Sequence, residues 1–277
     1  MFYSQTQSGC LINIPFFFNG YKLIRFLNSG FFSIVVKVEE KCSGQQYAAK
    51  IISKKEMRNE NKTELILNEI NILRSFNHPN IIKLYDVFEI KNDFNDEYYV
   101  LIMEYCSNGD LFDYATQIGF KDENEKKKIM FSFLKAIEYI HSNGISHGDI
   151  KPENILLDDD LNPKICDFGF CKTCIYSKDQ KRNFSICYAA PELFKRSEIN
   201  MLKADIWAIG ITLYCLSELS FPFVTGDDEF IAHEIQSGEL TIITEEKLQS
   251  LVEKCTKMCP NCRPNIKEIL NDEFFKI

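Results

Sequence analysis

The chain lacks any long hydrophobic run. No stretch of its 277 residues approaches the ~18 apolar residues that a helix needs to cross a bilayer. The apolar segment 11–18 is interrupted by Asn13 and Pro15 and has no basic segment before it, so we expect neither a membrane anchor nor a secretory signal. These absences predict an intracellular, cytoplasmic protein with no membrane partner.

The chain also has fewer positively charged than negatively charged residues. The 32 Lys and Arg residues stand against 40 Asp and Glu, which gives a net charge of −8 at pH 7. Binding to a nucleic-acid backbone depends on clustered Lys and Arg. The obvious basic run, residues 126–128, is interpreted as the solvated face of a helix. The composition therefore predicts no nucleic-acid partner, and it leaves the oligomeric state open.

Histidine is rare as well, with 4 residues against 11 cysteines. C-x-x-C spacing occurs at Cys171 and Cys174, and again at Cys259 and Cys262, close to Cys255. The two groups are far apart in the sequence and no nearby His completes either of them, so we expect reduced thiols. A zinc-dependent interaction module stays open as an alternative that metal analysis would test.

Residues 145–169 carry the densest polar chemistry of the chain. Short apolar runs at 155–157 and 164–166 flank a turn, which predicts a β-hairpin. The acidic turn, residues 158–163, resembles the start of a calcium loop. It lacks the Gly and the Glu that such a loop needs at its sixth and twelfth positions, so we interpret it as a solvated turn.

Two possible metal ligands flank this hairpin. Asn154 directly precedes the first strand and Asp167 follows the second, so strand pairing should bring both to the same end of the ladder. An amide oxygen and a carboxylate suit Mg²⁺, which takes its other ligands from water and substrate phosphates. Asp149 and Lys151, just upstream, supply a possible base and a cation beside that metal.

The N-terminal part of the chain is predicted to form a sheet. Residues 21–27 and 34–38 predict two strands around the tight turn 28–33. This context excludes a dinucleotide-binding fingerprint, which must open a helix. With Gly30 as its one glycine, the turn by itself indicates an ordinary hairpin, although Asn28 would tolerate left-handed backbone angles.

A buried ion pair is predicted between the next strand and helix. The strand 47–52 places Lys50 among apolar neighbours, and in the helix that follows Leu65 and Glu69 fall on one apolar stripe. A carboxylate is costly to bury without a cation, so we expect Glu69 to pair with Lys50. The alternative is a Glu69 at the edge of the stripe that reaches solvent.

The chain changes character after two further strands, 85–90 and 98–103. Up to that point it predicts a small, mainly antiparallel sheet with one helix, and beyond it mostly helices. We therefore predict an α+β protein with a first domain at 1–103, a connecting segment at 104–109 and a second domain at 110–277.

The segment 204–216 is apolar on nearly every face and too short to span a membrane, which predicts a buried core helix. Asp205 lies inside it. Because buried polar groups are hydrogen-bonded, we predict that Asp205 accepts from the backbone of the loop that contains Asp149.

Taken in order, these stretches resemble the catalytic domain of a eukaryotic protein kinase of serine/threonine type, from about residue 21 to 275. Residues 147–154 resemble the catalytic loop, 167–169 the metal-binding triplet and 190–192 the end of the activation segment. Residues 185–192 look most like the calcium/calmodulin-dependent and AMP-activated kinase group. The resemblance implies the two-lobed kinase fold, with the segment 104–109 as its hinge.

The resemblance also implies roles for the residues deduced above, with ATP and Mg²⁺ as cofactors. Lys50, oriented by Glu69, would hold the α- and β-phosphates. Asp149 would accept the hydrogen bond of a Ser or Thr hydroxyl on a protein or peptide substrate, and Lys151 would neutralise the transferring phosphoryl group. The implied metal ligands are Asn154 and Asp167.

The implied nucleotide-binding residues come from both lobes, with Met103 as gatekeeper and backbone groups of Glu104 and Cys106 holding adenine. The full set is Leu27, Asn28, Gly30, Val35, Ala48, Lys50, Met103, Glu104, Cys106, Asp110 and Leu156.

Three further implications concern substrate and stability. Asp110 and Glu153 match acidic positions that often select basic residues upstream of the phosphoacceptor, so we expect a basic peptide substrate. Ser185 resembles the small hydroxyl residue that contacts the base and the lysine. Arg263 resembles a late arginine that forms a salt bridge with Glu192.

The chain departs from the family pattern at Gly148, where the family has an arginine that usually pairs with an activation-loop phosphate. Thr173, Tyr176 and Ser177 stay possible modification sites without that partner. Substitutions around Ser185 (Phe184, Ile186) predict altered substrate docking, and those in the nucleotide loop (Asn28, Ser33) predict weaker ATP binding. The alternative function is therefore a pseudokinase scaffold with little turnover.

Overall fold

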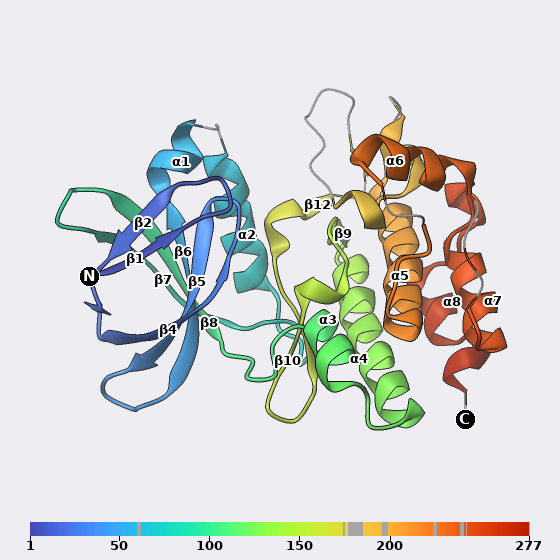
Figure 1. Cartoon of the computed structure of the whole chain (residues 1–277), viewed down its shortest axis with the longest axis horizontal. Helices are drawn as coiled ribbons and strands as arrows, with labels where there is room; N and C mark the ends of the chain where they lie inside the picture. The colour runs from blue at the N-terminus through green and yellow to red at the C-terminus, as the bar shows by residue number, and fades with distance from the viewer. Residues whose placement is uncertain are drawn as a thin grey trace. The chain divides into compact units, whose positions relative to one another are not determined.

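A computed structural model describes residues 1–59, 62–173, 175–176, 185–195, 199–223, 226–238, 241 and 243–276. Of the predicted sites, Cys174, Ser177 and Phe184 lie outside the described residues, and so do the side chains of Thr173 and Tyr176. The chain forms two compact units, Met1–Asn77 with Ile82–Ser107 and His78–Ile81 with Asn108–Ile277 (Figure 1). The change of unit after Ser107 falls within the predicted connecting segment.

The first unit is built on a six-stranded antiparallel sheet with the strand order β3-β4-β5-β6-β8-β7. The strands are β3 (Phe17–Phe18), β4 (Tyr21–Ser29), β5 (Ser33–Glu40), β6 (Gln46–Ser53), β7 (Leu84–Lys91) and β8 (Glu97–Glu104). Two helices follow β6, namely α1 (Lys54–Asn59) and α2 (Thr63–Ser75). A separate hairpin, β1 (Phe2–Gln5) with β2 (Leu11–Ile14), precedes the sheet (Figure 1).

The sheet is covered on both faces. Strand alternation sends one set of side chains into a core with the hairpin residues Ile12 and Ile14; that set includes Ile34, Val36, Val38, Ala49, Ile51, Val100 and Ile102. The opposite face meets α1 and α2 in a second cluster, whose buried members are Ile52, Met57, Ile66, Ile70 and Leu101. The hairpin and the two helices therefore pack on opposite faces of the sheet.

The second unit is mainly helical, with α3 (Leu111–Asp113), α4 (Glu123–Ser142), α5 (Met201–Glu218), α6 (Asp228–Ser237), α7 (Glu246–Cys255) and α8 (Ile266–Leu270). Its short strands pair as β9 (Ile145–Ser146) with β12 (Lys172–Thr173), β10 (Ile155–Leu157) with β11 (Pro163–Ile165), and β13 (Ile175–Tyr176) with β14 (Ile199–Asn200). Single helical turns occur at Tyr114–Ile118, Pro152–Asn154, Phe168–Phe170, Ile186–Tyr188, Pro191–Phe194, Pro260–Cys262 and Glu273–Phe275. In the part of the chain that the structure describes, no helix is long and apolar enough to cross a membrane.

The short segment His78–Ile81 groups with the second unit, although the prediction included it in the domain 1–103. Its contacts give the reason. The Asn80 side chain donates to the Pro163 carbonyl at 2.9 Å, and the Ile165 N–H donates to the Asn80 carbonyl at 2.9 Å. The segment is thereby hydrogen-bonded to β11, which no local sequence pattern indicates.

The basic run 126–128 is not a fully solvated face, and that part of the prediction is wrong. Lys126 is buried, and its ammonium pairs with Glu123 at 2.8 Å. Lys127 pairs with Glu245 at 3.3 Å and lies over the Phe274 ring. Long lysine stems cover apolar surface while their charged ends reach a partner, so these lysines stabilise the packing of α4.

Candidate active site

The predicted ion pair is present in the first unit. Lys50 on β6 and Glu69 on α2 lie 2.6 Å apart (Nζ to Oε1), and Glu69 is 4% exposed. The alternative of a solvent-reaching Glu69 is therefore wrong. Leu65, expected on the same stripe, is 41% exposed, because the buried face of α2 runs through Ile66 and Ile70 instead.

Strand register gathers several predicted nucleotide-binding residues on one face of the sheet. Val35 lies opposite Lys50, and Ala48 lies opposite Met103. These four side chains alternate with those that face the hairpin core, so they lie on the other face. At the end of β8, the Glu104 N–H donates to the Lys83 carbonyl at 2.9 Å, while Cys106 is buried.

The turn between β4 and β5 is tighter than expected. Asn28 is still in β4, where it pairs with Val35, and its φ is not positive. The left-handed angle considered for Asn28 is therefore not used, because the strand continues to Ser29. A Cβ at Gly30 would lie 2.7 Å from the Ser33 hydroxyl oxygen, so a larger residue there would require the Ser33 side chain to move.

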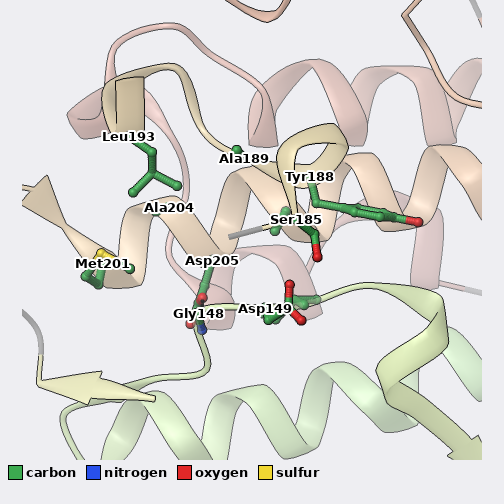
Figure 2. A pocket seen from close by; sticks show the side chains of 11 residues that line it. Gly148, Asp149, Ser185, Tyr188, Ala189, Leu193, Met201, Ala204 and Asp205 are labelled. Atoms are coloured by element: carbon green, nitrogen blue, oxygen red, sulfur yellow. Dashed lines mark hydrogen bonds between the residues drawn. The ribbon is translucent and has the colours of Figure 1, made fainter. Parts of the chain in front are cut away.

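In the second unit, Asp205 on α5 holds the loop that precedes Asp149. Its carboxylate accepts from the His147 N–H at 2.8 Å and from the Gly148 N–H at 2.9 Å, and it lies 2.9 Å from His141 Nε2. The prediction that this buried acid binds the loop backbone is confirmed. Asp205 fixes the direction in which the chain enters Asp149 (Figure 2).

Asp149 is the centre of a hydrogen-bonded cluster. Its Oδ2 lies 2.8 Å from Lys151 Nζ and accepts from the Asn154 side-chain amide at 2.9 Å. Lys151 also donates to the Ser185 hydroxyl at 2.7 Å, as expected of Ser185. Figure 2 shows Asp149 and Ser185 lining one pocket, and the Lys151 ammonium contacts both of them.

The two predicted metal ligands are placed by the β10–β11 hairpin. Ile155 pairs with Ile165, and the Cys166 N–H donates to the Asn154 carbonyl at 3.0 Å. Asp167 directly follows Cys166 in the chain, so both predicted ligands lie at the same end of the hairpin. The Asn154 amide nitrogen is engaged by Asp149, so its amide oxygen is the atom suited to a cation. This donor set fits Mg²⁺, which needs few protein ligands beside phosphate oxygens and water.

Asp167 has an unusual backbone. Its φ of 62° and ψ of 73° lie in the left-handed region, which costs a non-glycine residue about 1–3 kcal/mol. The next residue, Phe168, is fully buried and its ring meets the His147 ring edge-on, with centroids 5.2 Å apart. Burial of this ring offsets the strain at Asp167.

Asp110 and Leu156, the predicted nucleotide-binding residues of the second unit, are neighbours in an antiparallel bridge. The Asp110 carboxylate caps α3 by accepting from the Asp113 N–H at 2.9 Å. Burial raises the pKa of this carboxyl group, and the hydrogen bond from Asp113 counteracts that shift. Its capping role is thus structural, and a role in selecting basic substrates stays a prediction.

Glycine at position 148 has a structural reason. Its φ is +82°, and an added Cβ would lie 2.6 Å from the Phe170 carbonyl oxygen. A side chain there would be strained by the backbone angle, and its Cβ would fit only if the Phe170 backbone shifted. The arginine of the family pattern would be strained in this conformation.

We expect Gly148→Ala to destabilise the protein by more than the ~1–3 kcal/mol of backbone strain alone. Gly119→Ala is the matched control, because Gly119 has the same φ of +82° and nothing within 4 Å of its added Cβ. Chemical denaturation of both variants measures the difference. An equal loss of stability in the two would show that the Phe170 contact does not constrain position 148.

The predicted Glu192–Arg263 salt bridge is present and bidentate, with both N–O distances at 2.7 Å. Both residues are buried. Arg263 also donates to the carbonyls of Lys257 and Lys203, and its guanidinium lies over the Trp207 ring. It therefore ties the end of the activation segment to the C-terminal helices.

The cysteines do not form a zinc site in the part of the chain that the structure describes, where no group of three or more His, Cys, Asp or Glu side chains could hold a metal. Cys255 is fully buried, and burial raises the pKa of its thiol to about 12. Cys259 and Cys262 are exposed. Cys255 is therefore in a different environment from Cys259 and Cys262, because it is buried and they are exposed.

Comparison with known proteins agrees with this geometry. Residues 21–275 match the family model described as Protein kinase domain. The chain belongs to the protein kinase family. Kinases of this family use ATP and a divalent metal ion, generally Mg²⁺, and the predicted two-lobed kinase fold is confirmed.

Several curated kinases are similar over most of the chain. Serine/threonine-protein kinase cds1 of Schizosaccharomyces pombe is 33% identical over 273 residues, covering 92% of this chain and 58% of the relative. NUAK family SNF1-like kinase 1 of Homo sapiens is 36% identical over 255 residues, covering 91% of this chain and 38% of the relative. Serine/threonine protein kinase OSK3 of Oryza sativa subsp. indica is 35% identical over 271 residues, covering 93% of this chain and 50% of the relative.

These relatives confirm the resemblance to serine/threonine kinases of the calcium/calmodulin-dependent and AMP-activated group. The chain spans about half the length of the curated relatives that it matches.

Sequence reasoning missed one feature near the site. The first 20 residues suggested no structure, yet they form the β1–β2 hairpin and β3. The available signals were Ser8-Gly9 as a turn and the strand-forming run Leu11–Ile14.

Proposed function

We propose that this chain is an ATP-dependent serine/threonine protein kinase that transfers the γ-phosphoryl group of ATP to hydroxyls of protein substrates. The observation that carries the proposal is the contact of Asp149 with both Lys151 and Asn154. Phosphoryl transfer is catalysed mainly by positioning and charge neutralisation. A carboxylate, a cation and a metal-competent amide held together meet that need.

Each residue has a role in this proposal. Asp149 orients the substrate hydroxyl and accepts its proton, while Lys151 neutralises charge on the transferring phosphoryl group. Lys50, held by Glu69, binds the α- and β-phosphates. Mg²⁺, when bound through Asn154 and Asp167, neutralises phosphate charge.

Nucleotide binding is assigned to residues of both units, with adenine held by backbone groups of Glu104 and Cys106. From the first unit these are Leu27, Asn28, Gly30, Val35, Ala48, Met103, Glu104 and Cys106. Asp110 and Leu156 contribute from the second unit. The face of the sheet that carries Val35, Ala48 and Met103 supports this assignment, because it offers apolar contact beside the Lys50 ammonium.

The test is phosphorylation of a basic peptide library by the chain, by Asp149→Asn and by Asp167→Asn, with Mg-ATP and again with the metal chelated. A kinase gives a signal that both substitutions and chelation abolish. A pseudokinase scaffold gives the same low signal under all conditions.

We also propose that the substrate carries basic residues near its phosphoacceptor, read by Glu153. This carboxylate is exposed, and the Tyr188 hydroxyl donates to it at 3.3 Å. Burial raises the pKa of Tyr188, so its hydroxyl stays protonated and remains a donor. Glu153 is thereby oriented while its charge stays accessible to a guanidinium or ammonium group.

For Glu153→Gln we expect a two- to fivefold fall in kcat/KM on peptides with basic residues, in line with the ~0.2–1 kcal/mol of an exposed ion pair. Activity on peptides without such residues should not change. Glu123→Gln is the control, because Glu123 is 65% exposed and pairs with Lys126. A peptide array with no preference for basic positions would contradict the proposal.

A further inference from the structure

The N-terminal hairpin lies outside the family match, which begins at residue 21. It consists of β1, the turn 6–10 and β2. The family match does not include it, yet its turn contacts the nucleotide loop between β4 and β5. We define residues 29–31 as the braced segment of that loop.

Three hydrogen bonds join the turn to the braced segment. The Gln7 N–H donates to the Gly30 carbonyl at 3.0 Å, and the Ser8 N–H donates to the Phe31 carbonyl at 3.2 Å. The Gln7 side-chain amide donates to the Ser29 carbonyl at 2.7 Å. Three successive carbonyls of the loop are therefore bound by two residues of the hairpin.

These bonds orient the loop amides. Because a trans peptide group is planar and its C=O and N–H point in opposite directions, the N–H groups of Gly30, Phe31 and Phe32 point away from the hairpin. The Gly30 N–H donates to the Ser33 carbonyl at 2.8 Å. Among the described residues, the N–H groups of Phe31 and Phe32 donate to no protein acceptor. Consecutive backbone amides of this kind suit an anionic phosphate.

The hairpin is itself firmly held, so it can act as a brace. Ile12 and Ile14 are fully buried in the core on the far face of the sheet. The Asn92 side chain donates to the Asn13 carbonyl at 3.0 Å. Within the turn, the Thr6 N–H donates to the Cys10 carbonyl at 2.9 Å, and the Cys10 N–H donates to the Thr6 hydroxyl at 3.0 Å.

We propose that Gln7 is a positioning residue for ATP, acting through the braced segment. The inference rests on the proposed kinase function. This loop has a single glycine. The hydrogen bonds from the hairpin, rather than further glycines in the loop, set the direction of its backbone N–H groups. Gln7 acts at a distance from the chemistry, so its loss should change nucleotide affinity and leave the transfer step intact.

The test uses one isosteric substitution of Gln7 and one that restores a donor, both in the full chain. Gln7→Glu keeps the shape but replaces the donor to Ser29 with an acceptor, and Gln7→Lys restores a donor at this exposed position. Gln5→Glu is the control, because it adds the same charge to the hairpin and removes only a bond within it, from Gln5 to the Gly9 carbonyl. KM for ATP, kcat and the dissociation constant of Mg-ADP are measured for each.

We expect Gln7→Glu to raise KM for ATP and the Mg-ADP dissociation constant about three- to tenfold, with kcat within twofold. Gln7→Lys and Gln5→Glu should both stay close to the unsubstituted chain. Equal effects of Gln7→Glu and Gln5→Glu would overturn the inference, because a general effect of charge or hairpin stability would then explain them. No effect of Gln7→Glu would overturn it as well.

Failure of the proposed function gives a different result. A chain without peptide phosphorylation that still binds Mg-ADP would contradict the kinase activity, while the Mg-ADP measurements on Gln7→Glu and Gln5→Glu would still decide the role of Gln7. A chain that neither phosphorylates peptides nor binds Mg-ADP would overturn both.

Discussion

Replacing Asp149 with asparagine is expected to lower kcat by about 10²–10⁴-fold, the usual contribution of a positioned acid–base group. The substitution keeps the shape of the side chain and removes its negative charge. Lys151, now 2.8 Å from Asp149 Oδ2, loses its ionic partner, and the substrate hydroxyl loses its proton acceptor. Steady-state phosphorylation of a basic peptide measures the effect.

The matched control for this prediction is Asp159→Asn. Asp159 lies in the exposed turn after β10, ten positions along the chain, and has no assigned role. It should leave kcat unchanged, and both variants should bind Mg-ADP as the unsubstituted chain does. A fall of less than tenfold for Asp149→Asn, with substrate binding intact, would remove Asp149 from its proposed role.

Replacing Arg263 with alanine is expected to destabilise the protein by about 3–5 kcal/mol, because it leaves the buried Glu192 carboxylate without its cation. The guanidinium makes two bonds of 2.7 Å to Glu192 and stacks over Trp207. Removing it also breaks its hydrogen bonds to the carbonyls of Lys257 and Lys203. The free energy of unfolding, from chemical denaturation, gives the measured value.

Arg58→Ala is the control for this second prediction. Arg58 also forms an ion pair, with Glu97 at 3.1 Å, but its side chain is 64% exposed. Solvent screens such a pair, so little change in stability is expected. A comparable loss of stability in the two variants would contradict the claim that burial makes the Arg263 pair critical.

Much of the site was accessible from the sequence because buried charge needs a partner. Glu69 in an apolar stripe predicted its pairing with Lys50, and Asp205 in an apolar helix predicted its bonds to the loop backbone; both contacts are present. The hairpin β10–β11 was likewise predicted from two apolar runs and a turn. In each case the local sequence allowed few arrangements, because a buried charge needs a partner and two apolar runs around a turn favour a hairpin.

Other features depend on backbone details that residue types do not specify. Asn28 was considered for a left-handed angle, but the ladder with Val35 keeps it extended. Gly148 looked like the loss of an arginine, whereas its positive φ and the close approach of Phe170 favour a glycine there. Lys126 looked solvated, but packing of α4 buries it. Each depends on where a second segment of chain lies.

The sequence by itself determined the kinase family, the α+β class and the residues proposed for phosphoryl transfer, because motif spacing and the cost of buried charge are local properties. Tertiary structure alone decided that Gln7 and Ser8 bind the carbonyls of the nucleotide loop. Backbone carbonyls are the same in every residue, so a sequence carries no sign of which donor will reach them. Only packing of the hairpin on the sheet brings the two segments together.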